Sequence, residues 1–209
     1  TVSPDEIYCA VAEGKIENLP EILREPAAKA YDILARDYDG QLAEIVLDKA
    51  LFSLMNEAAT ASKNEFLIDW VDLNITVMNM KTALRGAYSK KSREFLLDSM
   101  LKCRRINIDE LANASVQDVS DVLEVFKHSG FEKAADAARE SVSEFEKWCD
   151  NELIRFMQPA RYKTFGFEPV LGFLVGKQFE LQAVRMILSG IRGGISAEVL
   201  RERLRDLYV

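Results

Sequence analysis

The amino-acid sequence contains two similar stretches, and an internal repeat constrains the fold more than any other sequence feature. Glu44, Asp48, Leu51, Met55 and Ala58 recur 102 residues later as Glu146, Asp150, Leu153, Met157 and Ala160. At an offset of 108 residues, Asp72-Leu73-Asn74, Met78 and Gly86 are followed by Glu180-Leu181-Gln182, Met186 and Gly194. A chance likeness of two amphipathic helices is the alternative, since Leu and Ala often share such spacing. The constant offsets favour a tandem repeat of helical bundles.

Long helices are predicted because the 209 residues include only ten Gly and five Pro, most of them at likely segment ends. Apolar residues from Leu42 to Ala58 follow a helical spacing. Ser3-Pro4-Asp5-Glu6 can form a capping box, Ser115 to Asp118 is a weaker start signal, and Ser196 can cap the last helix. The helices are expected at 27–39 and 41–59, at 66–85 closed by Gly86, and at 119–127, 131–158, 168–192 and 197–207.

The sequence therefore predicts an all-α protein made of tandem repeated helical bundles. Residues 1–14 are expected to be a remnant of, or lead-in to, the first repeat. The two helical-bundle repeats are expected at residues 15–112 and 113–209. The change of offset between the two sets of matches fits a short insertion at about residues 162–167.

Charge and cysteine content exclude several classes of function. With 27 Lys and Arg against 34 Asp and Glu, the net charge is −7, which argues against binding nucleic acid phosphates or anionic lipid. The three cysteines, Cys9, Cys103 and Cys149, form no C-x-x-C pair and predict neither a disulfide framework nor a thiolate zinc site. No apolar run approaches the length of a membrane span, so no direct membrane span is expected.

Motifs for catalysis or cofactor binding are weak. The one histidine, His128, stands at a predicted helix end, where an imidazolium favours the helix dipole. Glu44/Asp48 and Glu146/Asp150 are carboxylate pairs, but a di-iron bundle also needs Glu-x-x-His motifs, which the chain lacks. The stretch from Gly172 to Lys177 is too short for a phosphate loop, and its glycines are expected to let a neighbouring helix approach. No catalytic, cofactor or metal site is predicted.

The C-terminal stretch resembles the C subunit of bacterial and archaeal V/A-type ATPases, a relative of the eukaryotic d subunit. The likeness lies in residues 169–180, which read PVLGFLVGKQFE, in residues 183–190, and in the closing stretch 196–209, SAEVLRERLRDLYV. Asp72-Leu73-Asn74 and Leu84-Arg85-Gly86 resemble an earlier copy of the same motif. Ile191 stands where the family commonly has Lys, and Gln182 stands where the first copy has Asn74.

The resemblance implies a non-catalytic rotor part, seated between the central shaft and the membrane rotor ring, with no substrate or cofactor. Family members carry three helical units that form a funnel, so this chain resembles the last two. The implied location is cytoplasmic and peripheral to the membrane through the ATPase complex. The partners would be the shaft subunits and the ring, with no nucleic acid and no small-molecule substrate. A generic helical-repeat scaffold of another complex is the alternative function.

The resemblance also marks six residues as candidates for partner binding or for a structural motif: Asp72, Asn74, Arg85, Glu180, Gln182 and Arg185. Glu180 and Arg185 are five residues apart on one predicted helix and so lie on different faces. We expect at least one of the two to be partly buried and paired.

Overall fold

The computed structural model describes residues 2–36 and 38–208, and over these ranges the chain forms helices and loops without any strand. The all-α prediction is confirmed. The α-helices are α1 (Pro4–Glu13), α2 (Glu21–Arg36), α3 (Gly40–Ser62), α4 (Glu65–Tyr88), α5 (Arg93–Ser99), α6 (Ile108–Gln117), α7 (Val119–His128), α8 (Glu132–Glu140), α9 (Val142–Met157), α10 (Glu168–Arg192) and α11 (Ala197–Arg203). Two 3₁₀ segments, η1 (Ile16–Asn18) and η2 (Gln158–Tyr162), complete the pattern.

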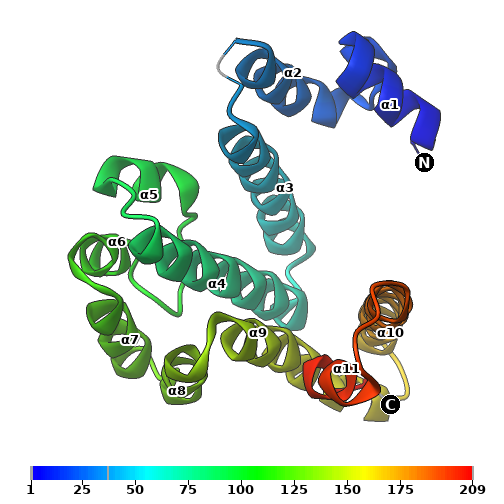
Figure 1. Ribbon diagram of the computed structural model, residues 1–209. Coiled ribbons are helices and arrows are strands. Elements are labelled where there is room, and N and C mark those ends of the chain that lie inside the picture. The colour runs from blue at the N-terminus through cyan, green and yellow to red at the C-terminus, as the bar shows by residue number, and fades with distance from the viewer. Residues whose placement is uncertain (1, 37, 209) are drawn as a thin grey trace.

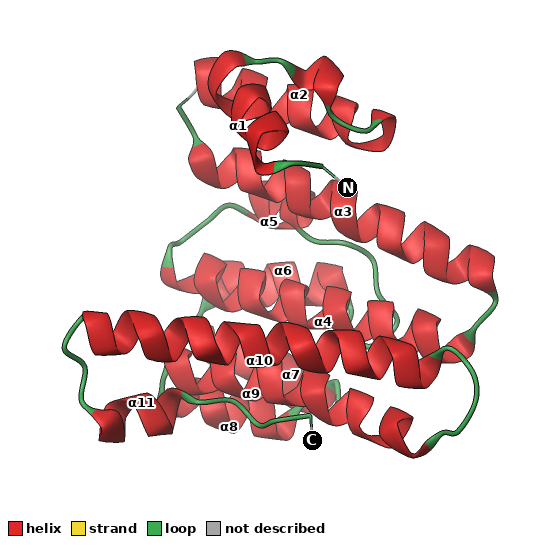
Figure 2. Cartoon of the chain, turned by 90° about the vertical axis from the view of Figure 1, so that its right-hand side faces the viewer, coloured by secondary structure: helices red, strands yellow, loops and turns green. Residues whose placement is uncertain are grey.

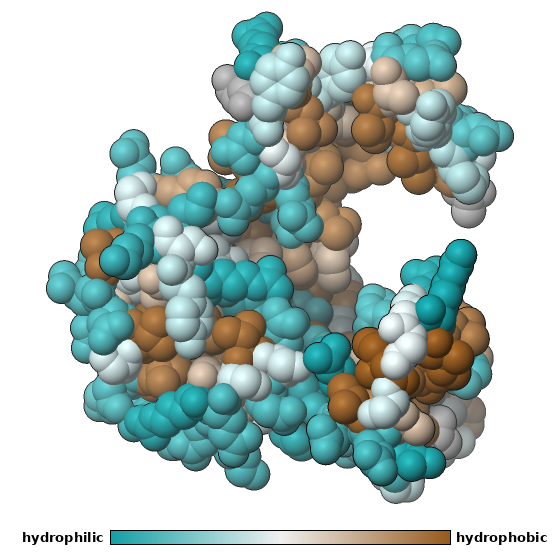
Figure 3. Space-filling model, in the orientation of Figure 1, coloured by the Kyte–Doolittle hydropathy of each residue, from teal (hydrophilic) through white to brown (hydrophobic). Residues whose placement is uncertain are grey.

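The helices follow an open arc (Figure 1). Helices α1 to α3 form one end, α4 crosses the middle, α5 to α8 line the far side, and α9 to α11 form the other end. Seen from the side, the long helix α10 runs lengthwise beside α9 and α11 (Figure 2). The surface is hollowed between the end formed by α1 to α3 and the end that carries α10 (Figure 3).

Helix α4 is the centre of the core. Twelve of its 24 residues are buried, because α3, α5, α6, α7 and α9 all pack against it. Next to α4, the ring of Phe126 on α7 stacks on the ring of Phe145 on α9, with 5.6 Å between the ring centroids. Helix α10 differs, since only Gly172, Val175 and Gly190 of its 25 residues are buried.

Several predicted helix ends are confirmed. Ser3 and Glu6 form the capping box of α1, with Glu6 accepting a hydrogen bond from the Ser3 backbone N–H at 2.7 Å. Helix α10 begins at Glu168 and ends at Arg192, as expected. The Ser196 hydroxyl caps α11 by accepting from the Val199 N–H at 3.4 Å.

Other predicted boundaries are wrong. The helix expected at 27–39 is α2, which begins earlier, at Glu21, and carries Pro26 inside; position 37 lies outside the described residues. The expected helix 131–158 is two helices, because the Ser141 side chain caps a new helix and breaks the run. Ser115 lies inside α6, and Asp118 caps α7 instead. Helix α11 ends at Arg203 rather than at residue 207.

Gly86 does not close α4 but lies inside it, facing Leu96 of α5, where an added Cβ would overlap the leucine side chain. Gly190 of α10 faces Leu200 of α11 in the same way. After each glycine a backbone hydrogen bond returns to its carbonyl, from Lys91 to Gly86 at 3.0 Å and from Ile195 to Gly190 at 2.9 Å. These pairs are related by an offset of 104 residues.

The structure therefore pairs Gly86 with Gly190, which corrects the sequence match of Gly86 with Gly194. The same offset pairs Lys90 with Gly194, and both have a positive φ, of 51° and 72°. Both long helices run unbroken, so Asp72 corresponds to Gly176 and not to Glu180. The sequence comparison was displaced by four residues, about one helical turn, a shift that preserves the apolar pattern.

We expect Gly86→Val to lower the free energy of unfolding by about 1–3 kcal/mol, because the new side chain overpacks the buried Leu96. Gly40→Val is the control, since nothing lies within 4 Å of a Cβ at Gly40. Chemical denaturation of both variants measures the difference. Equal stability of the two would contradict the close approach of α4 and α5.

Candidate interaction surfaces

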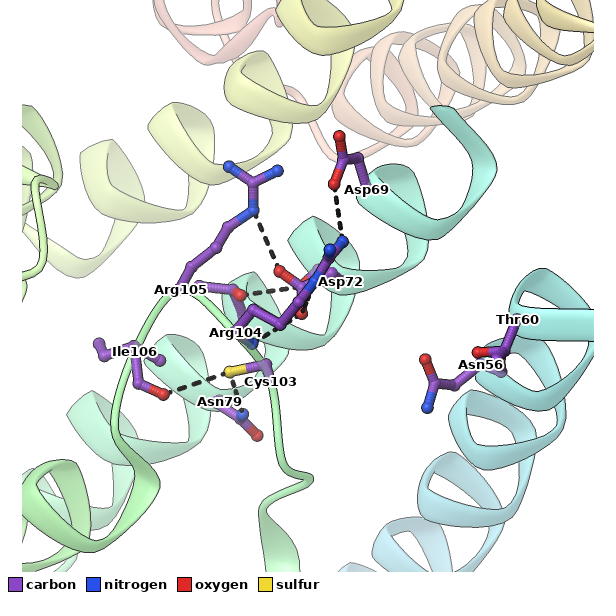
Figure 4. Close-up of polar contacts among 10 residues, drawn as sticks. Asn56, Thr60, Asp69, Asp72, Asn79, Cys103, Arg104, Arg105 and Ile106 are labelled. Atoms are coloured by element: carbon purple, nitrogen blue, oxygen red, sulfur yellow. Dashed lines mark hydrogen bonds and ion pairs between the residues drawn. The ribbon is translucent and has the colours of Figure 1, made fainter. Parts of the chain in front are cut away.

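Asp72 is buried on α4 and holds the loop that follows α5. Its Oδ1 accepts the backbone N–H of Arg104 at 2.7 Å, and its Oδ2 lies 3.2 Å from Nε of Arg105 (Figure 4). Arg104 also pairs with Asp69, one turn earlier on α4, at 2.7 Å. Because its lone pairs face the chain's own loop, Asp72 stabilises the fold and is not free for a partner.

Asn79 holds the same loop two turns further along α4. Its side chain accepts the N–H of Leu101 at 3.0 Å and donates to the Leu101 carbonyl at 2.6 Å. An amide that is both donor and acceptor to one residue fixes the backbone direction there. The sequence prediction did not include Asn79, and a buried polar residue in an apolar helix was the signal that could have found it.

We expect Asp72→Asn to cost about 1–3 kcal/mol of unfolding free energy, because it removes the charge that two arginines face. Asp69→Asn is the matched control: its pair is exposed, and such pairs contribute about 0–1 kcal/mol. Urea denaturation at low and high salt measures both. If Asp69→Asn were as destabilising as Asp72→Asn, the burial of Asp72 would not explain its contribution to the free energy of unfolding.

Asn74, half-buried on α4, donates its side-chain amide to the Trp70 carbonyl of its own helix at 2.7 Å. This hydrogen bond within the helix leaves Asn74 with a local role.

Arg85 is exposed on α4 and reaches across to α9, where its Nη2 lies 2.6 Å from Oε1 of Glu146. One turn earlier, Lys81 lies 3.1 Å from Oδ1 of Asp150, and Arg205 approaches the other carboxylate oxygen at 3.0 Å. Two cations four residues apart on α4 thus meet two carboxylates four residues apart on α9. The sequence prediction named Arg85 but not its partners.

The thiol of Cys149 lies in the same interface. Burial raises its pKa to about 12, although the Lys81 charge acts in the opposite direction. The group therefore stays a neutral thiol at physiological pH and acts as a small apolar side chain.

Glu180, Gln182 and Arg185 are all exposed on α10, and the expectation of a partly buried, paired charge there is wrong as to burial. Glu180 pairs only with Lys177 of its own helix, at 2.6 Å. Gln182 lines a small pocket beside Asp150 and Arg205. Arg185 makes no ion pair with any residue that the structure describes. The prediction failed because little of this chain covers α10.

Since Arg185 is exposed and makes no ion pair in the described chain, we expect Arg185→Ala to shift the melting temperature by less than about 2 °C. Lys81→Ala removes a half-buried partner of Asp150 and should lower the melting temperature by more than Arg185→Ala does. Calorimetric melting of the two variants measures this difference. A clear loss for Arg185→Ala would reveal a contact of the isolated chain that this geometry lacks.

Helix α10 carries exposed apolar side chains along one face, at helical spacings of three, four and seven residues, with Lys177 in the gap of seven. Its apolar members, named here the α10 stripe, are Val170, Leu174, Leu181, Val184, Leu188 and Ile191. Their exposed fractions lie between 46% and 64%, and the spacing is that of a helix–helix contact. Exposed apolar side chains that share one helix face indicate a surface that packs against a partner.

A second apolar surface lies at the other end of the arc. Helices α1, α2 and α3 enclose a groove of about 240 Å³ whose lining is almost entirely apolar, including Ile7, Val11, Leu47 and Leu51. Brown apolar atoms line this end and the α10 end where they border the hollow (Figure 3).

Gly172 and Gly176 accommodate an aromatic ring rather than a neighbouring helix. A Cβ at either position would overlap Tyr208, at 2.8 Å from its Cδ1 in the case of Gly176. The tail is also held by Asp206, whose N–H donates to Asn151 at 2.9 Å. Burial against α10 raises the pKa of Tyr208. These contacts tie the tail to α9 and α10.

The fold and its surfaces define an all-helical repeat protein with exposed apolar faces at both ends of its arc. A family model described as ATP synthase (C/AC39) subunit matches residues 1–203. The chain belongs to this family, which confirms the resemblance seen in its sequence. The family is that of a subunit of an ATPase complex.

Two curated relatives agree with the family match. The C subunit of the V-type sodium ATPase of Enterococcus hirae is 24% identical over 199 residues, which cover 91% of this chain and 59% of the relative. The C subunit of the A-type ATP synthase of Thermococcus kodakarensis is 23% identical over 202 residues, covering 92% and 55%. The chain thus spans between 55% and 59% of the length of these relatives. No solved structure matches the chain.

Among the residues that the structure describes, no helix is both long enough and apolar enough to cross a membrane.

Proposed function

We propose that the chain is a non-catalytic central-rotor subunit of a V/A-type ATPase, coupling the central shaft to the membrane rotor ring. It would serve ATP-driven or ATP-producing ion transport from the cytoplasmic side, peripheral to the membrane. The observation that carries the proposal is the family match over residues 1–203. The two repeats proposed at residues 15–112 and 113–209 would form part of a funnel.

The packing suits a part that transmits torque. A coupler has to hold its shape while two partners pull on it, and close-packed interiors have low compressibility. The burial of α4 against five other helices, and the ion pairs that join α4 to α9, provide that stiffness. In this role Asp72, Asn74 and Arg85 would stabilise the unit. Glu180, Gln182 and Arg185 are exposed and would be available to a partner.

The α10 stripe supports docking of a helical partner. A stable interface buries about 800 Å² on each side and is centred on apolar residues. An acidic chain with net charge −7 would also attract basic docking surfaces, and such steering affects association rates more than affinity. Association should therefore slow as salt screens charges beyond about 10 Å at 0.1 M.

Calorimetry of this chain against purified shaft subunits, and separately against the rotor ring in detergent, tests the proposal. We expect saturable binding to both, weakened at least about tenfold toward one of them by Leu188→Asp in the α10 stripe. Leu188 is 62% exposed, so the variant should fold. Val116→Asp is the control, because Val116 is 47% exposed on α6, away from the stripe. Absence of binding to both partners would defeat the coupling role and favour a scaffold of another complex.

A further inference from the structure

The segment that follows the short helix occurs in both copies of the repeat. The offset of 104 residues relates α5 to α11, so residues 100–104 correspond to residues 204–208. Ser92 and Ser196 cap the two short helices in the same way. In both copies the segment then returns to the long helix, α4 or α10. The two copies therefore show two ways of attaching the same segment to a long helix.

In the first copy, polar groups of α4 hold the segment. Asp72 accepts the backbone N–H of Arg104 at 2.7 Å, and Asn79 bonds both the N–H and the carbonyl of Leu101, at 3.0 Å and 2.6 Å. Hydrogen bonds are directional, so these three fix the segment relative to the helix. The segment and α4 therefore form one unit.

In the second copy, α10 lacks both polar groups. Gly176 and Ala183 stand where α4 has Asp72 and Asn79. Among the residues that the structure describes, no hydrogen bond joins α10 to residues 204–208. The attachment of α10 to the segment therefore depends on packing.

The packing consists of an aromatic ring in a notch of α10. At Gly172 an added Cβ would lie 2.9 Å from Cζ of Tyr208, and at Gly176 it would lie 2.8 Å from Cδ1, so glycine alone leaves room for the ring. Glycine is less favourable than alanine inside a helix, and the two glycines therefore weaken α10 by itself. Tyr208 also packs against the hydrophobic core. The ring is thus the part of the segment that packs tightly on α10.

The same segment is bound to α9 by polar contacts. Nε of Arg205 lies 3.0 Å from Oδ2 of Asp150, and the Asp206 N–H donates to the Asn151 side chain at 2.9 Å. The side chains of Arg205 and Asp150 are only 24% and 20% exposed, so solvent screens their pair less than a surface pair. After α11 the chain turns back and runs beside α9 (Figure 2). The segment is therefore fixed on α9 and meets α10 through the ring.

Helix α10 is otherwise lightly held in the described chain. Only Gly172, Val175 and Gly190 are buried, and the helix packs chiefly against α9, η2 and α11. Glycines with positive φ stand on either side of it, Gly166 at 107° and Gly194 at 72°, and hinge motions concentrate in such loop positions. Elements with little buried surface open more readily than the core. The position of α10 therefore depends on residues 204–208.

We propose that residues 204–208, named here the latch, stay bound to α9 and hold α10 in place through the Tyr208 ring, so that α10 can be released while the rest of the core stays folded. In the first copy the equivalent segment is hydrogen-bonded to the long helix itself, and α4 has no such release. Release changes the angle at which α10 presents its exposed apolar face. The inference concerns contacts within the chain and holds whichever complex the chain serves.

Hydrogen–deuterium exchange of the full chain, followed by mass spectrometry, tests the latch. We expect Tyr208→Ala to raise the exchange rate of the α10 amides at least about fivefold and to leave that of the α4 amides unchanged. Tyr208→Phe keeps the ring and should exchange as the parent does. Phe165→Ala is the matched control, because it removes a ring that is 88% exposed and lies outside the notch.

Gly176→Ala separates the latch from helix propensity. Alanine by itself stabilises a helix and would slow the exchange of α10. If the ring has to leave the notch, exchange of α10 should instead rise as it does in Tyr208→Ala. Slower exchange in Gly176→Ala, or unchanged exchange in Tyr208→Ala, would overturn the proposal. Equal acceleration in α4 and α10 would overturn it as well, because Tyr208 would then support the whole core.

A reversible disulfide provides the converse test. A Cβ at Gly176 would lie 2.9 Å from Cβ of Tyr208, within about 1 Å of the Cβ–Cβ distance of about 3.8 Å in disulfides. In Gly176→Cys/Tyr208→Cys, oxidation should bring the exchange of α10 to the parent's rate or below, and reduction should raise it to that of Tyr208→Ala. The parent in the same reductant is the control, because it has three free cysteines of its own. Equal exchange of α10 in the oxidised and reduced forms would contradict the latch.

Discussion

The burial of α4 is the constraint on which the rest of the structure depends. Its apolar residues extend around the helix, so no single neighbour can cover them, and α3, α5, α6, α7 and α9 each take part. Residues before and after α4 in sequence are thereby brought into one core. At its edges, Asp72 Oδ1 and the side-chain amide of Asn79 bind loop backbone, and the second carboxylate oxygen of Asp72 pairs with Arg105 at 3.2 Å.

The turn that follows the long helix is the same after Gly86 and after Gly190, whereas the packing around the two long helices differs. The glycine–leucine contact between the long and the short helix is the same in both. It depends only on residues close in sequence, so it survives whatever packs outside. The burial of the long helix differs between the two copies, because it depends on the helices that follow in the chain. Helix α4 has such a unit in α6 to α9, whereas the described chain supplies none for the equivalent side of α10.

What the sequence predicted well was local. The capping box at Ser3, the ends of α10 and the all-helical class follow from residue types and spacings that act over one or two turns. The break at Ser141 was missed because a run without Gly or Pro reads as one helix until a side chain caps it. The register of the second repeat was wrong by four residues, because a one-turn shift leaves the apolar face unchanged. The exposure of Arg185 could not be predicted from the sequence, since it depends on which other helices pack against α10.

The exposure of the α10 stripe has a consequence for how such a sequence changes over time. Inside α4, a polar substitution at Leu84 or Met80 is opposed by folding itself, since both are buried. At Leu181 or Leu188, which are exposed, we expect the isolated chain to tolerate the same change, and in the proposed role only a bound partner would oppose it. In that role, selection on α4 would act through the abundance of the protein, and selection on α10 would act through the partner. The two helices would then change at different rates, and the changes in α10 would follow those of the surface that it meets.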